Sequence, residues 1–245
     1  MAFTLHVSFV AASPAAETEV IDALRVFSSL QKPGTGMLTY LFSRPKPDSP
    51  LEFFEVYADA TAFWGHAADP AFSAAFVNGF KPSNKARSVT QGFGVPEDKA
   101  DLVRVTCDGY LNALYPEPFA GSFWGRTSDA DVAGDVIIRL DSGDRDLLAA
   151  AVAAAASSDG VLLALGSVSP HDPARYIMML HTVSADAAMR VLAGSALALA
   201  ADASLSVGVL TPSDDVSAAA LTGLSVLGLA EKTMRCEIVA GFLRL

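Results

Sequence analysis

Two Pro- and Asp-rich turn sequences decide the fold of this chain: RPKPDSP at residues 44–50 and SPHDP at residues 169–173. Each turn joins two apolar runs, which is typical of a β-hairpin. Around each hairpin the pattern follows the same order of strand, helix, strand, hairpin, strand, helix, strand, first over residues 3–93 and again over residues 135–210. We therefore predict an α+β fold of two tandem ferredoxin-like βαββαβ units.

The first unit has clear element boundaries. Phe3 to Val10 alternates apolar and polar residues, the period expected of a strand. A helix is predicted from Pro14 to about Leu30, because Ser13 can cap it and proline suits the first helical position. The remaining predictions are strands at 37–43, 51–57 and 87–93, and a helix from residue 60 that breaks near residue 69 and restarts at Pro70 to run through Phe80.

The second unit repeats this order in a more apolar sequence. Strands are predicted at 136–140, 161–168, 176–183 and 205–210, with helices at 145–156, 185–200 and 216–231. Segments 102–111 and 235–243 resemble each other, and we expect each to add a fifth strand to its own unit, with 115–126 as a packed linker. The expected domains are 1–98, an extra strand and linker at 99–133, and 134–245. We expect antiparallel sheets packed face to face, a dimeric α/β barrel within one chain, and hence a monomer.

Composition excludes several classes of partner. The 245 residues include 17 Lys and Arg against 27 Asp and Glu, a net charge of −10. Nucleic acid and anionic membranes need a basic surface, so neither is an expected partner. No run reaches the about 20 apolar residues of a membrane span, and the start has no leader pattern, so a cytoplasmic location is expected. Cys107 and Cys236 lie in apolar runs, which predicts buried thiols.

The densest chemical signal is the run FFEVYADATAFWGHAADPAF at residues 53–72. It resembles the antibiotic-biosynthesis monooxygenase family of the dimeric α/β-barrel superfamily, over roughly the first 95 residues. The matching positions are Glu55, Tyr57, Asp59, Ala62, His66, Asp69 and Phe72, and Asp69 stands where the family usually has Ser. The resemblance implies a pocket between sheet and helices. Characterised members of the family include cofactor-free oxygenases of electron-rich aromatic substrates and relatives that bind and degrade haem with a Trp and a His, and many members have no assigned reaction.

His66 is the candidate catalytic residue. On a helix it shares a face with Ala62 and Phe63, which directs it toward the sheet. A histidine in this setting is either a core residue hydrogen-bonded to a backbone carbonyl or a pocket residue able to transfer protons near neutral pH. The sequence leaves both interpretations open.

Further residues are candidates for substrate binding. His6 and Ser8 share one face of a strand, and Glu55 and Tyr57 share one face of another. If these faces coincide, they form a polar cluster in an apolar shell, as in a small-molecule pocket; the alternative is a face that meets solvent. Trp64 lies about 200° around the helix from His66 and could instead be a core or interface residue. The candidate pocket walls are completed by Tyr40, Phe72 and Phe76.

The sequence lacks the common motifs for metal binding, phosphate binding and serine hydrolase activity. The four histidines, at positions 6, 66, 171 and 181, lack helical metal-ligand spacing, and no Gly-rich phosphate loop or Gly-x-Ser-x-Gly elbow occurs. We expect a monooxygenase-like protein that oxidises a small aromatic or enolisable substrate without a cofactor, with His66 as base or hydrogen-bond donor. The alternative is a non-catalytic protein that binds a small molecule or haem. The pocket is expected in the first unit, because Leu and Met fill the second.

Overall fold

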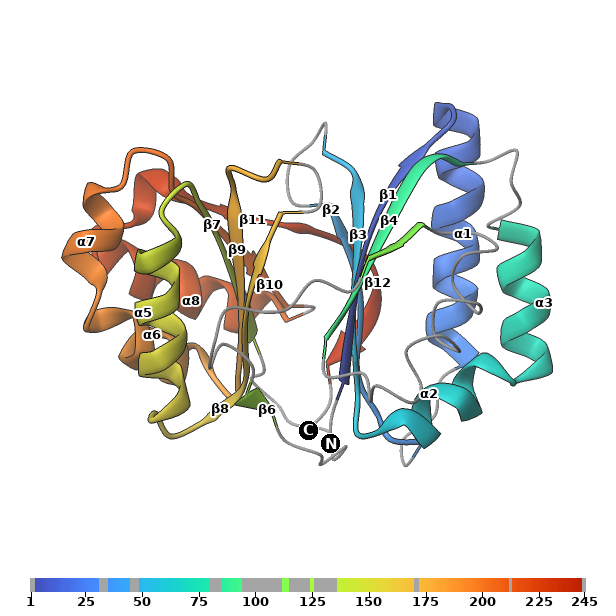
Figure 1. The fold of residues 1–245 in the computed structure, drawn as a ribbon, viewed down its shortest axis with the longest axis horizontal. Coiled ribbons are helices and arrows are strands. Elements are labelled where there is room, and N and C mark those ends of the chain that lie inside the picture. The colour runs from blue at the N-terminus through green and yellow to red at the C-terminus, as the bar shows by residue number, and fades with distance from the viewer. Residues whose placement is uncertain are drawn as a thin grey trace. The chain divides into compact units, whose positions relative to one another are not determined.

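The chain folds into two units, each built on one six-stranded sheet (Figure 1). The computed structural model describes residues 3–30, 35–44, 49–79, 85–93, 112–114, 124–125, 136–169, 172–211 and 213–243. The first unit comprises residues 1–115, 127–131 and 237–245, and the second comprises residues 116–126 and 132–236. The predicted α+β class with two ferredoxin-like units is confirmed. The face-to-face packing of the two sheets stays a prediction.

The first sheet has the strand order β12-β2-β3-β1-β4-β5 and is antiparallel except for the parallel pair β4 and β5. Its strands are β1 (Phe3–Ala11), β2 (Met37–Arg44), β3 (Leu51–Tyr57), β4 (Lys85–Phe93), β5 (Asn112–Leu114) and β12 (Glu237–Leu243). Helices α1 (Pro14–Leu30), α2 (Ala60–Ala67) and α3 (Pro70–Gly79) lie on one side of this sheet (Figure 1).

Helix α1 shows why the sequence forms these elements. The Ser13 hydroxyl accepts a hydrogen bond from the amide of Ala16 at 3.2 Å, so the predicted cap is present. The buried face of α1 carries Val20, Leu24 and Phe27 at helical spacing. These side chains pack in one core with alternate residues of the strands, including Val7. Burial of such side chains supplies about 1.5–3 kcal/mol each.

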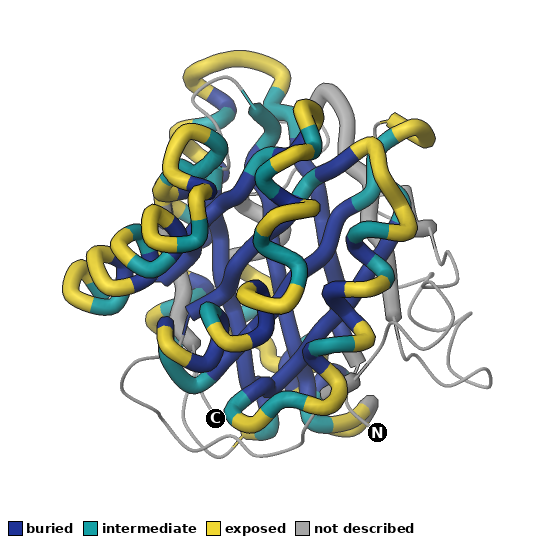
Figure 2. The backbone as a smooth tube through the Cα atoms, turned by 90° about the vertical axis from the view of Figure 1, so that its left-hand side faces the viewer, coloured by how far each residue is buried: buried dark blue, intermediate teal, exposed yellow. Residues whose placement is uncertain are grey.

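The second sheet has the strand order β11-β10-β7-β9-β8-β6. Its strands are β6 (Trp124–Gly125), β7 (Val136–Ser142), β8 (Val161–Val168), β9 (Tyr176–Thr182), β10 (Ser206–Leu210) and β11 (Thr233–Arg235). The helices are α5 (Arg145–Ala156), α6 (Ala185–Ala193), α7 (Ala196–Ala201) and α8 (Asp214–Val226), followed by the 3-10 turn η3 (Ala230–Lys232). Figure 2 shows buried strands behind helices whose outer turns are exposed.

The two units repeat one another in backbone detail. β2 and β8 each begin after a glycine with positive φ, Gly36 at 74° and Gly160 at 80°. The carbonyl of Gly36 accepts a hydrogen bond from the amide of Ala58 at 2.8 Å, and that of Gly160 accepts one from Val183 at 2.9 Å. Each strand also has a register shift directly after its first residue, in the same place relative to its hairpin partner. The predicted repetition of element order therefore extends to single residues.

The helix that follows the hairpin also starts alike in both units. Asp59 accepts a hydrogen bond from the amide of Ala62, and Ser184 accepts one from the amide of Ala187. Tyr57 pairs with Phe3 and Thr182 pairs with Val136, in each case the first residue of the unit's first strand. Both residues also lie two positions before a helix cap, so Tyr57 and Thr182 are equivalent. This equivalence allows every residue of a site in one unit to be compared with its counterpart in the other.

One sequence-based strand assignment was wrong, and a segment expected to be a linker contains a short strand. The segment 235–243 does not add a fifth strand to the second unit: Arg235 ends β11 in the second sheet, whereas β12 pairs with β2 in the first sheet. Conversely, the expected linker 115–126 contains β6, which pairs with β8 of the second sheet. Each sheet thus receives an edge strand from a segment outside its own βαββαβ sequence. Pairing between distant segments is a tertiary property that local patterns do not encode.

Some sequence-based assignments fall outside the described residues. These are the strand at 102–111, the centres of the two hairpins, Phe80 and His171. The C-terminal helix is confirmed as α8, one turn shorter than predicted. In the described part of the chain, no helix combines the length and the apolar character that a membrane crossing requires.

We expect Gly36→Ala and Gly160→Ala each to lower the free energy of unfolding by about 2 kcal/mol in urea titrations. Positive φ disfavours any side chain there, and an added Cβ would lie 2.8 Å from the Ala62 Cβ or 2.9 Å from the Val183 Cγ2. The matched control is Gly194→Ala, where φ is −65° and no atom lies within 4 Å of the added Cβ. Equal stability of all three variants would contradict the proposed repeat of this backbone turn.

Candidate functional site

His66 lies on α2 and is enclosed by aromatic rings. Only 8% of its surface is exposed. Its ring centroid is 3.8 Å from that of Phe72, 5.3 Å from that of Tyr40 and 6.1 Å from that of Tyr57. Residues from α3, β2 and β3 therefore hold the imidazole in place. The prediction that His66 points toward the sheet is confirmed.

Within the described part of the chain, neither ring nitrogen of His66 has a hydrogen-bond partner, although both are buried. The interpretation of His66 as a core histidine bonded to a backbone carbonyl is therefore wrong. Burial lowers the pKa of His66 to about 4, against a smaller opposing effect of the Asp69 charge. At neutral pH the ring is thus neutral, with one nitrogen able to donate and the other able to accept. Leaving such a group unsatisfied costs about 1–3 kcal/mol, which a purely structural residue would not need.

A second polar group, Glu55, is buried on β3 next to these rings. Its surface is 9% exposed, and its Oε2 accepts a hydrogen bond from the Tyr57 hydroxyl at 2.7 Å. Burial raises the pKa of Glu55 to about 7, although the Tyr57 hydrogen bond acts in the opposite direction. Tyr40 is the cross-strand partner of Glu55, and burial together with the Glu55 charge raises the pKa of Tyr40 well above its usual value. The carboxyl therefore changes protonation near neutral pH.

A pocket of about 540 Å³ opens beside His66. It lies between the end of α1, the start of β2 and the outer turns of α2 and is lined by Leu30, Thr35, Gly36, Ala58, Asp59, Thr61, Ala62, Gly65, His66 and Asp69. Small residues leave the space open: a Cβ added at Gly65 would have no atom within 4 Å. The described lining carries two aspartates and no lysine or arginine. This wall favours a neutral ligand over an anion.

The hypothesis that His6, Ser8, Glu55 and Tyr57 share one face is wrong. In the β1 and β3 register Leu5 lies opposite Glu55, while His6 lies opposite Phe54, so the two polar pairs project to opposite faces of the sheet. His6 instead forms a buried contact with Glu52, with 3.2 Å between Nε2 and Oε2. Strand alternation shows which residues share a face, but it does not say which face of one strand matches that of the next.

The predicted aromatic residues divide between the core and the site. Trp64 packs edge-on against Phe63, at 4.7 Å between ring centroids, and is not among the residues described as lining the pocket. Phe72 contacts both His66 and Phe27, so it joins the site to the core. Phe76 lies on α3, and its side chain is outside the described part of the structure. Tyr40 and Tyr57 contact His66 but are not among the described residues that line the pocket.

The second unit lacks this polar cluster. By register and helix cap, Tyr40, Glu55, Tyr57 and His66 correspond to Ala164, Leu180, Thr182 and Val191. Three of these four counterparts belong to the apolar core of the second unit. The same backbone thus folds without the carboxyl, the imidazole and the two phenols. The polar cluster is therefore not needed for the fold itself.

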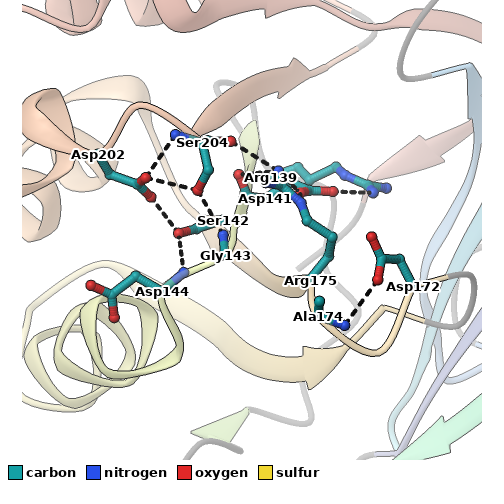
Figure 3. Close-up of polar contacts among 10 residues, drawn as sticks. All are labelled: Arg139, Asp141, Ser142, Gly143, Asp144, Asp172, Ala174, Arg175, Asp202 and Ser204. Carbon is teal, nitrogen blue, oxygen red and sulfur yellow. Dashed lines mark hydrogen bonds and ion pairs between the residues drawn. The ribbon is translucent and has the colours of Figure 1, made fainter.

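The main polar network of the second unit is of a different kind (Figure 3). Asp202 accepts hydrogen bonds from the hydroxyls of Ser142 and Ser204, and Arg175 binds both Asp141 and the carbonyl of Ser204. These groups satisfy one another and tie the ends of β7, β9 and β10 together. We interpret this network as structural. Across the described residues, no group of three or more His, Cys, Asp or Glu side chains is placed to hold a metal ion.

Sequence reasoning missed most of the pocket wall. Thr35, Gly36, Ala58, Thr61 and Gly65 were not singled out as site residues. A possible signal was the glycine that precedes the second strand of each unit, Gly36 and Gly160, because at both positions the backbone lies close to the helix that follows the hairpin. Small residues on a helix are otherwise too common to indicate a cavity.

Comparison with protein families finds no match, and no curated protein matches the chain. Among solved structures, a candidate monooxygenase from Fusobacterium nucleatum is similar at 8% identity and a TM-score of 0.47, covering 99% of this chain and 94% of its own. One from Lactobacillus acidophilus has 11% identity and a TM-score of 0.46, covering 84% and 91%. A dabb family protein with a ferredoxin-like fold from Mesorhizobium loti has 20% identity and a TM-score of 0.31, covering 39% and 96%. These likenesses are remote, and no residue role is transferred from them.

The opposite pKa shifts of Glu55 and His66 predict opposite effects of two substitutions on stability. Between pH 4.5 and 6.5, Glu55 and His66 together bind one proton in both states: Glu55 holds it in the folded protein, and His66 holds it in the unfolded chain. The effects of the two groups on the pH dependence of stability therefore cancel in this range. In His66→Val only the Glu55 contribution remains, and stability should fall by roughly 3 kcal/mol as pH rises from 4.5 to 7. In Glu55→Leu only the His66 contribution remains, and stability should fall by a similar amount as pH drops from 6.5 to 4.

Urea unfolding at several pH values measures both slopes. Each replacement copies the residue at the equivalent position of the second unit, so the backbone already accommodates it. Parallel pH profiles for the two variants and the parent protein would show that the two groups are not buried as described.

Proposed function

We propose that the first unit binds a small, neutral, aromatic or enolisable molecule in the pocket beside His66 and oxidises it without a cofactor, as a monooxygenase-like enzyme. The observation that carries this proposal is the pair of buried, unpartnered nitrogens of His66 at the wall of a pocket. A bound ligand toward which the imidazole turns would supply the missing hydrogen bond. The pocket volume of about 540 Å³ is in the range typical of small-molecule sites.

The chemistry requires a substrate that can act as its own reductant. A methylene group next to a conjugated carbonyl loses a proton, and the resulting enolate gives electrons to dioxygen. The C–O bond then forms as a hydroperoxide, and loss of water leaves a second carbonyl. The sum is R₂CH₂ + O₂ → R₂C=O + H₂O, in which the substrate supplies all the electrons. The protein has to provide a proton acceptor, a donor for the enolate oxygen and a dry site.

His66 suits the role of hydrogen-bond donor. Its pKa of about 4 keeps the ring neutral at pH 7, so it can donate a hydrogen bond to an oxygen that gains negative charge. The same pKa makes it a weak base, and the donor role is therefore favoured over that of the proton's final acceptor. Tyr40 and Phe72 pack on the ring and exclude water from that side.

Two further features support the proposal. The run at residues 53–72 resembles the antibiotic-biosynthesis monooxygenases, whose characterised members include cofactor-free oxygenases. The two units repeat the same backbone, but among the described residues the polar cluster occurs in the first unit alone. A tandem fusion of two such units in which one copy kept the site would give this arrangement.

Ligand binding without turnover is the second candidate function, and haem is the relevant special case. The unpartnered His66 nitrogen could supply an axial ligand. However, the described lining offers Asp59 and Asp69 and no basic residue to the two haem propionates. The described lining therefore fits haem poorly, and we derive no step through it.

Anthrone is a suitable probe, because it is neutral and has a methylene between two aromatic rings conjugated to a carbonyl. We expect it to bind, as measured by calorimetry without oxygen, and to consume one dioxygen per anthraquinone formed when oxygen is admitted. His66→Val should abolish the oxidation and weaken binding about tenfold, since a hydrogen bond to the carbonyl oxygen of the ligand is lost. Binding without oxygen uptake would favour the non-catalytic alternative, and a spectral titration with haem tests that case.

Filling the pocket should separate function from stability. Gly65→Leu places a side chain into the open space and should block anthrone binding, while stability stays equal or rises by about 1 kcal/mol because glycine is a poor helix former. The control is Gly194→Leu at the end of α6 in the second unit, where an added Cβ also has no atom within 4 Å. If Gly65→Leu binds and oxidises anthrone like the parent protein, the pocket is not the site.

A further inference from the structure

The proposed reaction needs a group that takes the substrate's proton, and His66 is a weak base because its pKa is about 4. A general base has to come within hydrogen-bond reach of the proton that it removes. Among the described residues that line the pocket, the titratable side chains besides His66 are those of Asp59 and Asp69. One of these two carboxylates is therefore the candidate base.

Asp69 lies directly beside His66, between the end of α2 and the start of α3. Its backbone amide donates a hydrogen bond to the carbonyl of His66 at 3.1 Å. The Asp69 charge opposes the effect of burial on the pKa of His66, and Asp59 is not among the groups that shift this pKa. A small substrate whose carbonyl oxygen binds the imidazole therefore has its methylene within reach of Asp69.

The helix that Asp69 caps holds its carboxylate in one orientation. The Asp69 Oδ1 accepts hydrogen bonds from the amide of Ala71 at 2.8 Å and from the amide of Phe72 at 3.3 Å. The ring centroid of Phe72 is in turn 3.8 Å from that of His66. Both bonds use Oδ1, and the residue is exposed, so a ligand in the pocket can reach Oδ2.

The second unit separates the two aspartates further. Asp59 corresponds to Ser184, and each caps its helix through the amide three residues later, so capping accounts for Asp59. The residue before α7, which follows α6 as α3 follows α2, is Ser195. Within the described part of that unit, the Ser195 side chain makes no capping hydrogen bond. A helix can thus start at this place without a carboxylate, which indicates a further role for Asp69.

We propose that Asp69 is the general base that removes the methylene proton of the bound substrate. This proposal rests on the proposed function of the pocket. The substrate C–H bond breaks, its proton forms an O–H bond with Asp69, and its electron pair stays on the substrate as an enolate. Dioxygen then adds to the enolate carbon, the peroxide takes the proton back from Asp69, and the hydroperoxide loses water to leave the ketone.

The charges of the pocket suit this division of roles. Proton abstraction moves one negative charge from Asp69 to the enolate oxygen and adds no net charge to the site. A neutral His66 can turn toward that oxygen and donate a hydrogen bond to it. An aspartate is a sufficient base for a proton next to a carbonyl when a hydrogen-bond donor stabilises the enolate.

Exchange of the anthrone methylene protons with D₂O in the absence of oxygen, followed by NMR, isolates proton abstraction from oxidation. The parent protein should speed exchange above the rate in buffer alone. Asp69→Asn should slow the protein-dependent rate about 100-fold or more, as expected for loss of a general base. Asn caps helices as well as Asp does, so the variant should still fold and bind anthrone in urea titrations and calorimetry. Asp69→Ser, which keeps a capping hydroxyl, should give the same result.

The matched control is Asp144→Asn, the same change at an aspartate that caps α5 of the second unit through the amides of Asp146 and Leu147. It should exchange like the parent protein. Asp59→Asn should keep exchange at least about tenfold faster than Asp69→Asn does. Parent-like exchange in Asp69→Asn, or an equal or larger loss in Asp59→Asn, would overturn the proposal while leaving the proposed function in place. Failure of the parent protein to bind anthrone or to speed its exchange would instead overturn both.

Discussion

Helix α2 can lie close to the start of β2 only because residue 36 has no side chain. Gly36 has a φ of +74°, and a Cβ there would be 2.8 Å from the Cβ of Ala62. Its carbonyl binds the amide of Ala58, and the next residue, Asp59, caps α2. These contacts fix where α2 begins. The position of His66, seven residues after the cap, follows from them, and with it the contacts to Tyr40 and Tyr57.

The second unit uses the same constraint at Gly160 and reaches a different interior. There, the residue seven positions after the cap is Val191, and it packs in an apolar core with Leu180. In the first unit the equivalent residues are an imidazole and a carboxyl, each of which would weaken the fold if it served only to fill space. The folded protein avoids part of that penalty because both groups are uncharged: His66 is neutral, and Glu55 keeps its proton up to about pH 7.

The sequence predicted the elements well, because capping residues, prolines and strand alternation are local signals. Ser13, Pro14 and the alternation from Phe3 to Val10 placed β1 and α1 within a residue of their observed bounds. It did not predict the partners of β12 and β6, because strand pairing across long separations depends on the folded context. The same limit applies to His6 and Glu55: alternation assigned each to one side of its strand, but only the register showed that the sides differ.

The site was predictable to the extent that a local motif encodes it. The run at residues 53–72 indicated His66 and its helix, and the structure gives His66 the pocket, the burial and the unpartnered nitrogens that a ligand-binding residue needs. The sequence also indicated Glu55 as a pocket residue, but strand alternation alone could not show that Glu55 and His6 lie on opposite faces of the sheet.

The central claim is that His66 is a neutral, unpartnered imidazole held beside a ligand pocket. Nitrogen-15 NMR of the histidine rings as a function of pH tests it most directly, with His66→Val used to assign the signal. The account predicts that His66 stays neutral throughout the range from pH 5 to 8 and gains its second proton only near pH 4. A midpoint near 6.5, the ordinary value for an exposed histidine, would contradict it.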